Sequence, residues 1–156
     1  MSDQDFMSVA IELAKAGVEE GLGGPFGAVV VKDGIIIGRG QNRVLADTDP
    51  TAHAEVVAIR AACTHLGSFQ LDDCTLYTSC EPCPMCLGAI YWARPARMVY
   101  ACTRDDASAV GFDDGMIYEE INRSIEDRRI PTQQCMRTES LKVMALWAKK
   151  TDKTEY

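Results

Sequence analysis

The chain has 156 residues, about the length of one ordinary domain, with 47% hydrophobic and 25% charged residues, as in globular proteins that bury a core. Its formal net charge of −7 excludes the domain-wide basic field typical of proteins that bind duplex nucleic acid or tRNA. No stretch has the length of a membrane-spanning helix, and the acidic N-terminal sequence MSDQDF does not resemble a secretory signal. We therefore expect one cytoplasmic domain over residues 1–156, with neither nucleic acid nor membrane as a partner.

The first half of the chain predicts a helix, a hairpin and a second helix. Apolar residues recur at helical spacing over 6–17. Two β-rich runs, 26–32 and 35–40, flank the dipeptide Asp33-Gly34, which is typical of a two-residue hairpin turn. After a polar loop, helical spacing returns over 52–65, and a glycine two residues later is expected to end that helix.

The second half predicts strands that alternate with helices. In order, these are a strand over 74–79, a helix over 84–92, a strand over 97–102, a loop over 103–115, a short helix over 116–122, a last strand over 132–138 and a helix over 141–148. An antiparallel hairpin followed by such alternation favours the α/β class. The expected architecture is a three-layer α/β/α sandwich around a mixed five-stranded sheet.

A cluster of cysteines suggests a metal site. Seven cysteines occur at irregular positions, and CEPCPMC places three of them at 80, 83 and 86. Without an export signal they are expected to be reduced thiols or metal ligands rather than disulfides. His53, one of only two histidines, lies at the start of the predicted helix over 52–65. One imidazole and two thiolates suit Zn²⁺, and three protein ligands leave the fourth tetrahedral position open, as in catalytic zinc sites.

Local backbone preferences separate the three clustered cysteines. Pro84 disfavours helical angles at Cys83 and suits the first position of a helix, so Cys83 is expected to be its N-cap. Cys86 then lies one turn later on the same face. Cys80 precedes the helix, at the end of the predicted strand. If Cys80 also bound the metal, the site would be a closed His/Cys₃ structural zinc site, and the sequence leaves this alternative open.

Glu55 follows the candidate histidine ligand by two residues. A glutamate in the first helical turn commonly complements the helix dipole. Beside an open zinc site it has a second role available, because zinc lowers the pKa of a bound water towards roughly 7 and a carboxylate can take that proton and return it to a substrate.

The pattern His-x-Glu … Pro-Cys-x-x-Cys is the signature of the zinc-dependent nucleobase deaminases, and HAE at 53–55 and PCPMC at 82–86 match it. The flanking segments resemble the small bacterial guanine deaminases of the cytidine/deoxycytidylate deaminase superfamily. These segments are GGPFGAVVVKDG, DPTAHAEVVAIR, QLDDCTLYTSCEPCPMCLGAIYWARP, GFDDG, IYEEI and the C-terminal EY. The resemblance implies a cytidine-deaminase-like fold and a hydrolase of purine metabolism that converts guanine to xanthine and ammonia. Deaminases of cytosine, adenine, an amino-triazine or tRNA adenosine remain alternatives, as does a structural zinc protein.

The resemblance also implies roles for individual residues. His53, Cys83 and Cys86 would hold one Zn²⁺ per subunit, and Glu55 would be the catalytic proton shuttle. The residues implied in contact with the purine base are Phe26, Asn42, Ala54, Trp92, Asp114 and Tyr156. The family tends to form homodimers that exchange C-terminal segments, here about 132–156, so that Tyr156 would complete the site of the partner.

Most of these base contacts have a structural alternative that the sequence leaves open. The alternatives are a core position for Phe26 or Trp92, a turn for Asn42, a helix N-cap for Asp114 or Asp113, and a frayed terminus for Tyr156. Because a free purine presents N–H donors, we expect Asp114 and Asn42 to supply acceptors.

Overall fold

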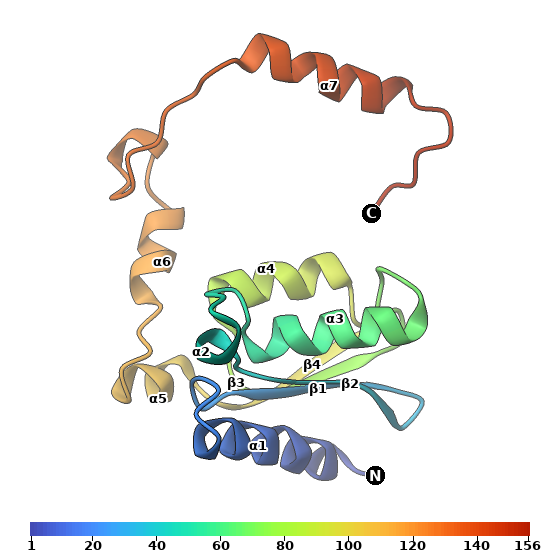
Figure 1. Cartoon of the computed structure of the whole chain (residues 1–156), viewed down its shortest axis with the longest axis vertical. Coiled ribbons are helices and arrows are strands. Elements are labelled where there is room, and N and C mark those ends of the chain that lie inside the picture. The colour runs from blue at the N-terminus through green and yellow to red at the C-terminus, as the bar shows by residue number, and fades with distance from the viewer. The chain divides into compact units, whose positions relative to one another are not determined.

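The computed structural model describes all residues 1–156, which form two compact units, Met1–Asp114 and Gly115–Tyr156. The first unit contains a four-stranded sheet with α1 on one face and α3 and α4 on the other (Figure 1). Its elements are α1 (Asp3–Glu19), β1 (Gly27–Lys32), β2 (Ile35–Gln41), α2 (Val44–Asp47), α3 (Ala54–Leu66), β3 (Thr75–Cys80), α4 (Pro84–Ala93), β4 (Arg97–Cys102) and α5 (Arg104–Ala109). The predicted α/β/α sandwich is confirmed.

The sheet is mixed, with strand order β2-β1-β3-β4. Strand β1 pairs antiparallel with β2 and with β3, whereas β3 and β4 run parallel. Asp33 and Gly34 join β1 to β2 with φ angles of 50° and 75°, the left-handed values that a two-residue hairpin turn requires. The parallel pair places the ends of β3 and β4 at the same edge of the sheet, and Cys80 lies opposite Cys102 there.

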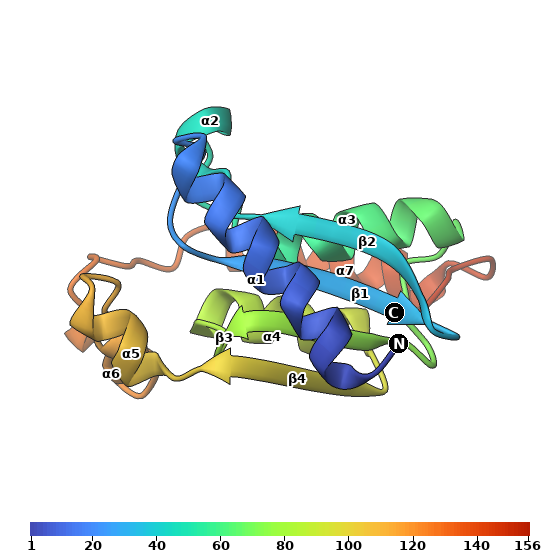
Figure 2. The same ribbon diagram turned by 90° about the horizontal axis from the view of Figure 1, so that it is seen from below.

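Helices pack directly on both faces of the sheet. Figure 2 shows α1 lying across the strands on its own face, where Phe6, Val29 and Tyr77 form a buried cluster. On the opposite face, small residues of α3 lie against the sheet. A Cβ added at Gly40 would lie 2.1 Å from the carbonyl oxygen of Ala54. The glycine therefore lets the N-terminal end of α3 touch β2, and this is the end that carries the candidate metal ligand and Glu55.

The second unit contains α6 (Gly115–Ile121), a short 3₁₀ helix (Ile125–Asp127) and α7 (Arg137–Lys149), and none of its residues is buried. The fifth strand predicted over 132–138 is absent, so the sheet has four strands rather than five. The prediction was wrong because Met136 adopts a left-handed φ of 54° and Arg137 begins α7, so the chain leaves the extended conformation inside that range. None of the helices combines the length and apolar character needed to cross a bilayer.

Candidate functional site

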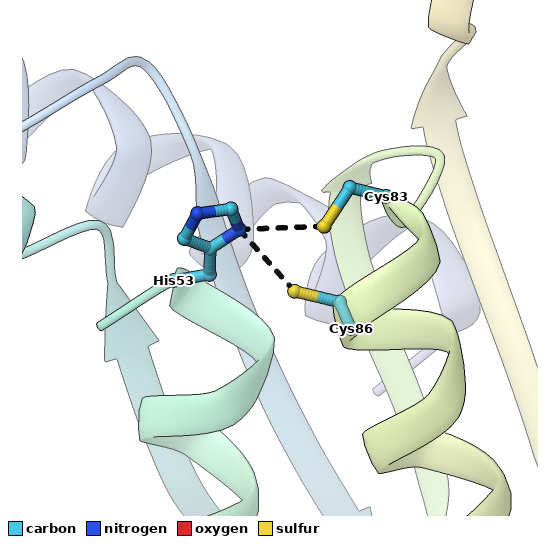
Figure 3. A group of neighbouring side chains, drawn as sticks. All are labelled: His53, Cys83 and Cys86. Carbon is cyan, nitrogen blue, oxygen red and sulfur yellow. Dashed lines mark hydrogen bonds between the residues drawn. The ribbon is translucent and has the colours of Figure 1, made fainter. Parts of the chain in front are cut away.

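Two helix N-termini converge on the candidate metal ligands. His53 is the N-cap of α3 and Cys83 is the N-cap of α4, both with extended backbone angles, and Cys86 lies one turn into α4 (Figure 3). The Nδ1 atom of His53 lies 3.5 Å from the Cys83 sulfur and 3.4 Å from the Cys86 sulfur. Zn–N and Zn–S bonds in a tetrahedral site would place such atoms about 3.6 Å apart. The three side chains therefore fit a tetrahedral zinc ion whose fourth coordination position is open.

The two cysteine thiols and His53 are electrostatically coupled. A hydrogen bond from Cys86 lowers the pKa of the Cys83 thiol to about 4, with a smaller contribution from His53. The same bond, together with burial, raises the pKa of Cys86. Contact with Cys83 raises the pKa of His53. Without a metal, Cys83 therefore carries the negative charge and Cys86 keeps its proton. A divalent cation bound by both thiolates would replace that proton, since metal binding to cysteines releases protons.

Glu55 is buried beside this cluster, with 6% of its surface exposed. Burial raises the pKa of its carboxyl group. The hydroxyl of Thr78, itself 1% exposed, lies 3.2 Å from Glu55 Oε1 and can donate to it. A first-turn glutamate that only complements the helix dipole has no need to be buried, so the position of Glu55 favours the proton-shuttle role.

Cys80 lies outside the group of ligand atoms. His53, Cys83 and Cys86 place their ligand atoms within 4.8 Å of one another, and Cys80 is not part of that group. It ends β3, where its thiol donates to the carbonyl oxygen of Thr103 at 3.5 Å. Burial raises the pKa of Cys80 to about 11, so the thiol stays protonated. The structure thus brings together the open three-ligand set and not the closed His/Cys₃ set.

The match to known proteins covers both this site and the whole chain. Residues 1–102 match the cytidine and deoxycytidylate deaminase zinc-binding region. The chain belongs to this family. A guanine deaminase from Bacillus subtilis is 57% identical over all 156 residues of both chains. The X-ray structure of guanine deaminase from Bacillus subtilis superposes with a TM-score of 0.97 at 57% identity, covering 100% of this chain and 99% of that one.

More distant members of the family match only part of the chain. A guanine deaminase from Nitrosomonas europaea superposes with a TM-score of 0.70 at 36% identity, covering 73% of this chain and 66% of the other. A tRNA-specific adenosine deaminase from Haemophilus influenzae is 41% identical over 119 residues, which are 72% of this chain and 68% of that protein.

Among the expected base contacts of this deaminase, Asn42 is buried and forms a local turn. It is 4% exposed, and its Oδ1 accepts a hydrogen bond from the backbone N–H of Val44 at 3.1 Å. That bond fixes which way the amide faces, because a backbone N–H can only donate. The turn alternative is therefore present in the structure, and Oδ1 keeps a second lone pair with which it can accept another hydrogen bond.

Phe26, Ala54 and Asp114 belong to the first unit. The Phe26 ring packs edge-on against Phe112 with centroids 5.0 Å apart, and Ala54 is the first residue of α3. The Asp114 side chain is 19% exposed and pairs with the Arg104 Nε at 3.5 Å. Burial raises the pKa of Asp114, the cation of Arg104 lowers it, and the nearby Cys83 raises it further. Asp114 is thus a carboxylate within electrostatic range of a metal ligand.

Trp92 and Tyr156 are both largely exposed. Trp92 is 63% exposed and follows Cys83 by nine residues, which is about 13 Å along the helix axis and half a turn away from it. Tyr156 ends the second unit and is 69% exposed. Their assigned roles stay predictions.

Sequence reasoning missed several residues that surround the site. Thr78 and Arg104 gave no local signal, because their contacts with Glu55 and Glu81 join residues 23 positions apart. Helix α5, which lies inside the predicted loop 103–115, did have a local sequence signal. Thr103 and Asp106 form a reciprocal capping box, a pattern readable as Thr-x-x-Asp before a helix.

Proposed function

We propose that this protein catalyses the hydrolytic deamination of guanine, giving xanthine and ammonia. The observation that carries the proposal is the three-ligand His53, Cys83, Cys86 centre with a buried carboxyl, Glu55, beside it. The likeness to a guanine deaminase extends over the whole chain, whereas the likeness to tRNA-specific deaminases does not. The net charge of −7 further disfavours a polyanionic tRNA substrate. The reaction places the protein in purine catabolism or salvage.

One Zn²⁺ per subunit would be held by His53, Cys83 and Cys86. When bound, zinc acts as a Lewis acid that makes a water molecule reactive near neutral pH. Glu55 carries out the proton transfers. Its buried carboxylate takes one proton from the attacking water and gives it to a ring nitrogen beside C2 of guanine. It then takes the remaining proton of the hydroxyl group added at C2 and delivers it to the departing amino group, which leaves as ammonia while the C2 oxygen becomes a carbonyl.

The purine base would be held by residues around Glu55. Asp114 accepts from the N–H donors of guanine, and Asn42 contacts the base with the acceptor and donor capacity that its single bond to the Val44 N–H leaves free. Phe26 contacts the ring face, and Ala54 borders the pocket at the start of α3. A missing partner in such a buried site is costly, which is how the pocket would reject other bases.

The active assembly would be a homodimer in which the C-terminal segment, about 132–156, is exchanged. In support, no residue of Gly115–Tyr156 is buried, and α7 exposes apolar residues that an isolated 13-residue helix cannot shield from water. The exposed apolar residues of α7 are Leu141, Val143, Met144, Leu146 and Trp147. A second copy of the chain would cover them, and Tyr156 and Trp92 would close the pocket.

The test is ammonia release from guanine by the zinc-loaded protein, compared in parallel with adenine, cytosine, cytidine and a tRNA substrate. Guanine is expected to be turned over with the highest kcat/KM, and activity should disappear with a chelator and return with zinc. Absence of ammonia from guanine while another substrate is turned over would contradict the proposal.

A further inference from the structure

Three hydrogen bonds join residues 80–81, just before the metal-binding cysteines, to residues 102–104, where β4 ends and α5 begins. The backbone N–H of Glu81 donates to the Cys102 carbonyl oxygen at 2.8 Å. The Glu81 carboxylate accepts the backbone N–H of Arg104 at 3.0 Å. The Cys80 thiol donates to the Thr103 carbonyl oxygen at 3.5 Å. Since Glu81 precedes Cys83 by two residues, the position of α5 is tied to the position of the metal ligand.

Helix α5 in turn determines where Asp114 lies. The N–H of Phe112 returns to the carbonyl oxygen of Ala107 at 3.0 Å, and the Phe112 ring packs on Phe26. The Arg104 side chain extends from the first residue of α5 to Asp114 and places its Nε 3.5 Å from Oδ1. The backbone of Arg104 is therefore held by Glu81 while its side chain holds Asp114.

We infer that Arg104 is a positioning residue for guanine binding, because it orients the Asp114 carboxylate through its Nε contact with Oδ1. The inference rests on the proposed function, because it takes Asp114 as the acceptor for the N–H groups of the base. Arg104 itself does not touch the reacting atoms.

The physical reason is that a half-buried carboxylate needs a partner to stay charged and fixed in direction. An arginine supplies this better than a lysine does, because its planar guanidinium presents several donors in a rigid arrangement. Without the Arg104 guanidinium, the Asp114 side chain can occupy more rotamers, and its ionised form loses the stabilisation that the cation provides. The base therefore loses a preorganised hydrogen-bond acceptor. Glu55 and the metal ligands keep their positions, so the rate of the chemical step is unchanged. The substitution therefore weakens the affinity for the base.

The experiment compares Arg104→Ala, Arg104→Lys and Asp114→Asn in the zinc-loaded full-length protein. Arg104→Ala is expected to raise KM for guanine about tenfold while kcat changes by less than about threefold, as when an interaction common to bound substrate and transition state is lost. Arg104→Lys should recover part of that loss. In the Asp114→Asn background, Arg104→Ala should have no further effect. Arg39→Ala, which removes an equal charge from an exposed position on β2, serves as the matched control.

Binding of guanine to the same substitutions in a Glu55→Gln background, measured by calorimetry, gives a readout that does not depend on turnover. Weakened binding that parallels the KM change supports the inference. An unchanged KM in Arg104→Ala, or an Arg104→Ala effect that persists in Asp114→Asn, overturns it. Failure of the proposed function would instead show as a wild-type protein that does not act on guanine.

Discussion

At the scale of single residues, Glu55 is the side chain on which the chemistry depends. Glu55→Gln keeps the shape of the side chain but removes its ability to carry a proton. We expect kcat to fall by about 10²–10⁴-fold, the usual contribution of a general acid–base group. Zinc content should be unchanged, because all three ligands remain. Ammonia release and metal analysis on the same sample check both statements, and near-normal turnover would contradict the role.

Thr78 is a side chain that positions Glu55 by a hydrogen bond. Its hydroxyl lies 3.2 Å from Glu55 Oε1 and 3.0 Å from the carbonyl oxygen of Cys80, so its single proton serves one acceptor at a time. Thr78→Val keeps the branched shape without the donor, and we expect kcat to fall about tenfold with little change in KM, which corresponds to the loss of one hydrogen bond to a charged group.

Thr78→Ser is the matched variant, because it retains the hydroxyl and loses only a methyl group. Most of the activity should return in Thr78→Ser. If serine is as poor as valine at this position, packing rather than the hydrogen bond is responsible.

Whether a site residue could be predicted depends on how local its cause is. The metal ligands and their caps follow from neighbours in sequence. Pro84 makes Cys83 an N-cap, and Cys86 follows one turn later, as predicted. The sequence leaves the turn at Asn42 open, because that turn depends on a backbone conformation that brings Oδ1 to the Val44 N–H. The contact of Thr78 with Glu55 joins β3 to α3, and only the tertiary structure brings these two elements together.

At the scale of elements, predictions that rest on local sequence signals are correct, and a prediction without such a signal is wrong. The hairpin at Asp33-Gly34, the end of α3 at Gly67 and the limits of β4 agree with the sequence-based assignments, because turn and cap residues mark them. The false strand over 132–138 rested on a short run without alternation of apolar and polar residues. The composition of a short segment does not determine its conformation when no sheet neighbour pairs with it.

The contact between β2 and α3 depends on Gly40. Gly40→Ala would place a methyl group 2.1 Å from the Ala54 carbonyl oxygen, next to His53. The helix must move, so we expect a stability loss of about 1–3 kcal/mol and weaker zinc retention. Thermal unfolding and metal release to a chelator measure the two effects.

Gly17→Ala provides the control for Gly40→Ala. Its added Cβ meets only an ordinary contact, with the Gln41 Cβ at 3.6 Å. The substitution should be neutral or should stabilise α1, by roughly 0.5–1 kcal/mol, because alanine favours helix more than glycine does. Zinc retention in Gly17→Ala should match the wild type. Equal behaviour of the two variants would show that the close approach at Gly40 does not position the metal ligand.

At the scale of the whole molecule, exchange of the C-terminal segment makes a distinct prediction. If each site combines Glu55 of one chain with Tyr156 of the other, two defective chains can complement each other. A Glu55→Gln chain supplies an intact tyrosine, and a Tyr156→Ala chain supplies an intact glutamate. A hybrid dimer then holds one complete site and one site with both defects.

Co-expressing the two variants in equal amounts should therefore restore about a quarter of wild-type activity per site, because half of randomly formed dimers are hybrids. The control pairs Glu55→Gln with the double variant Glu55→Gln/Tyr156→Ala, which contains no intact glutamate and should stay inactive. A mixture whose activity equals the average of the two parents, or a Tyr156→Ala protein with full activity, would show that each chain completes its own site. In that case the exposed apolar face of α7 must be covered in a way that leaves the active site unshared.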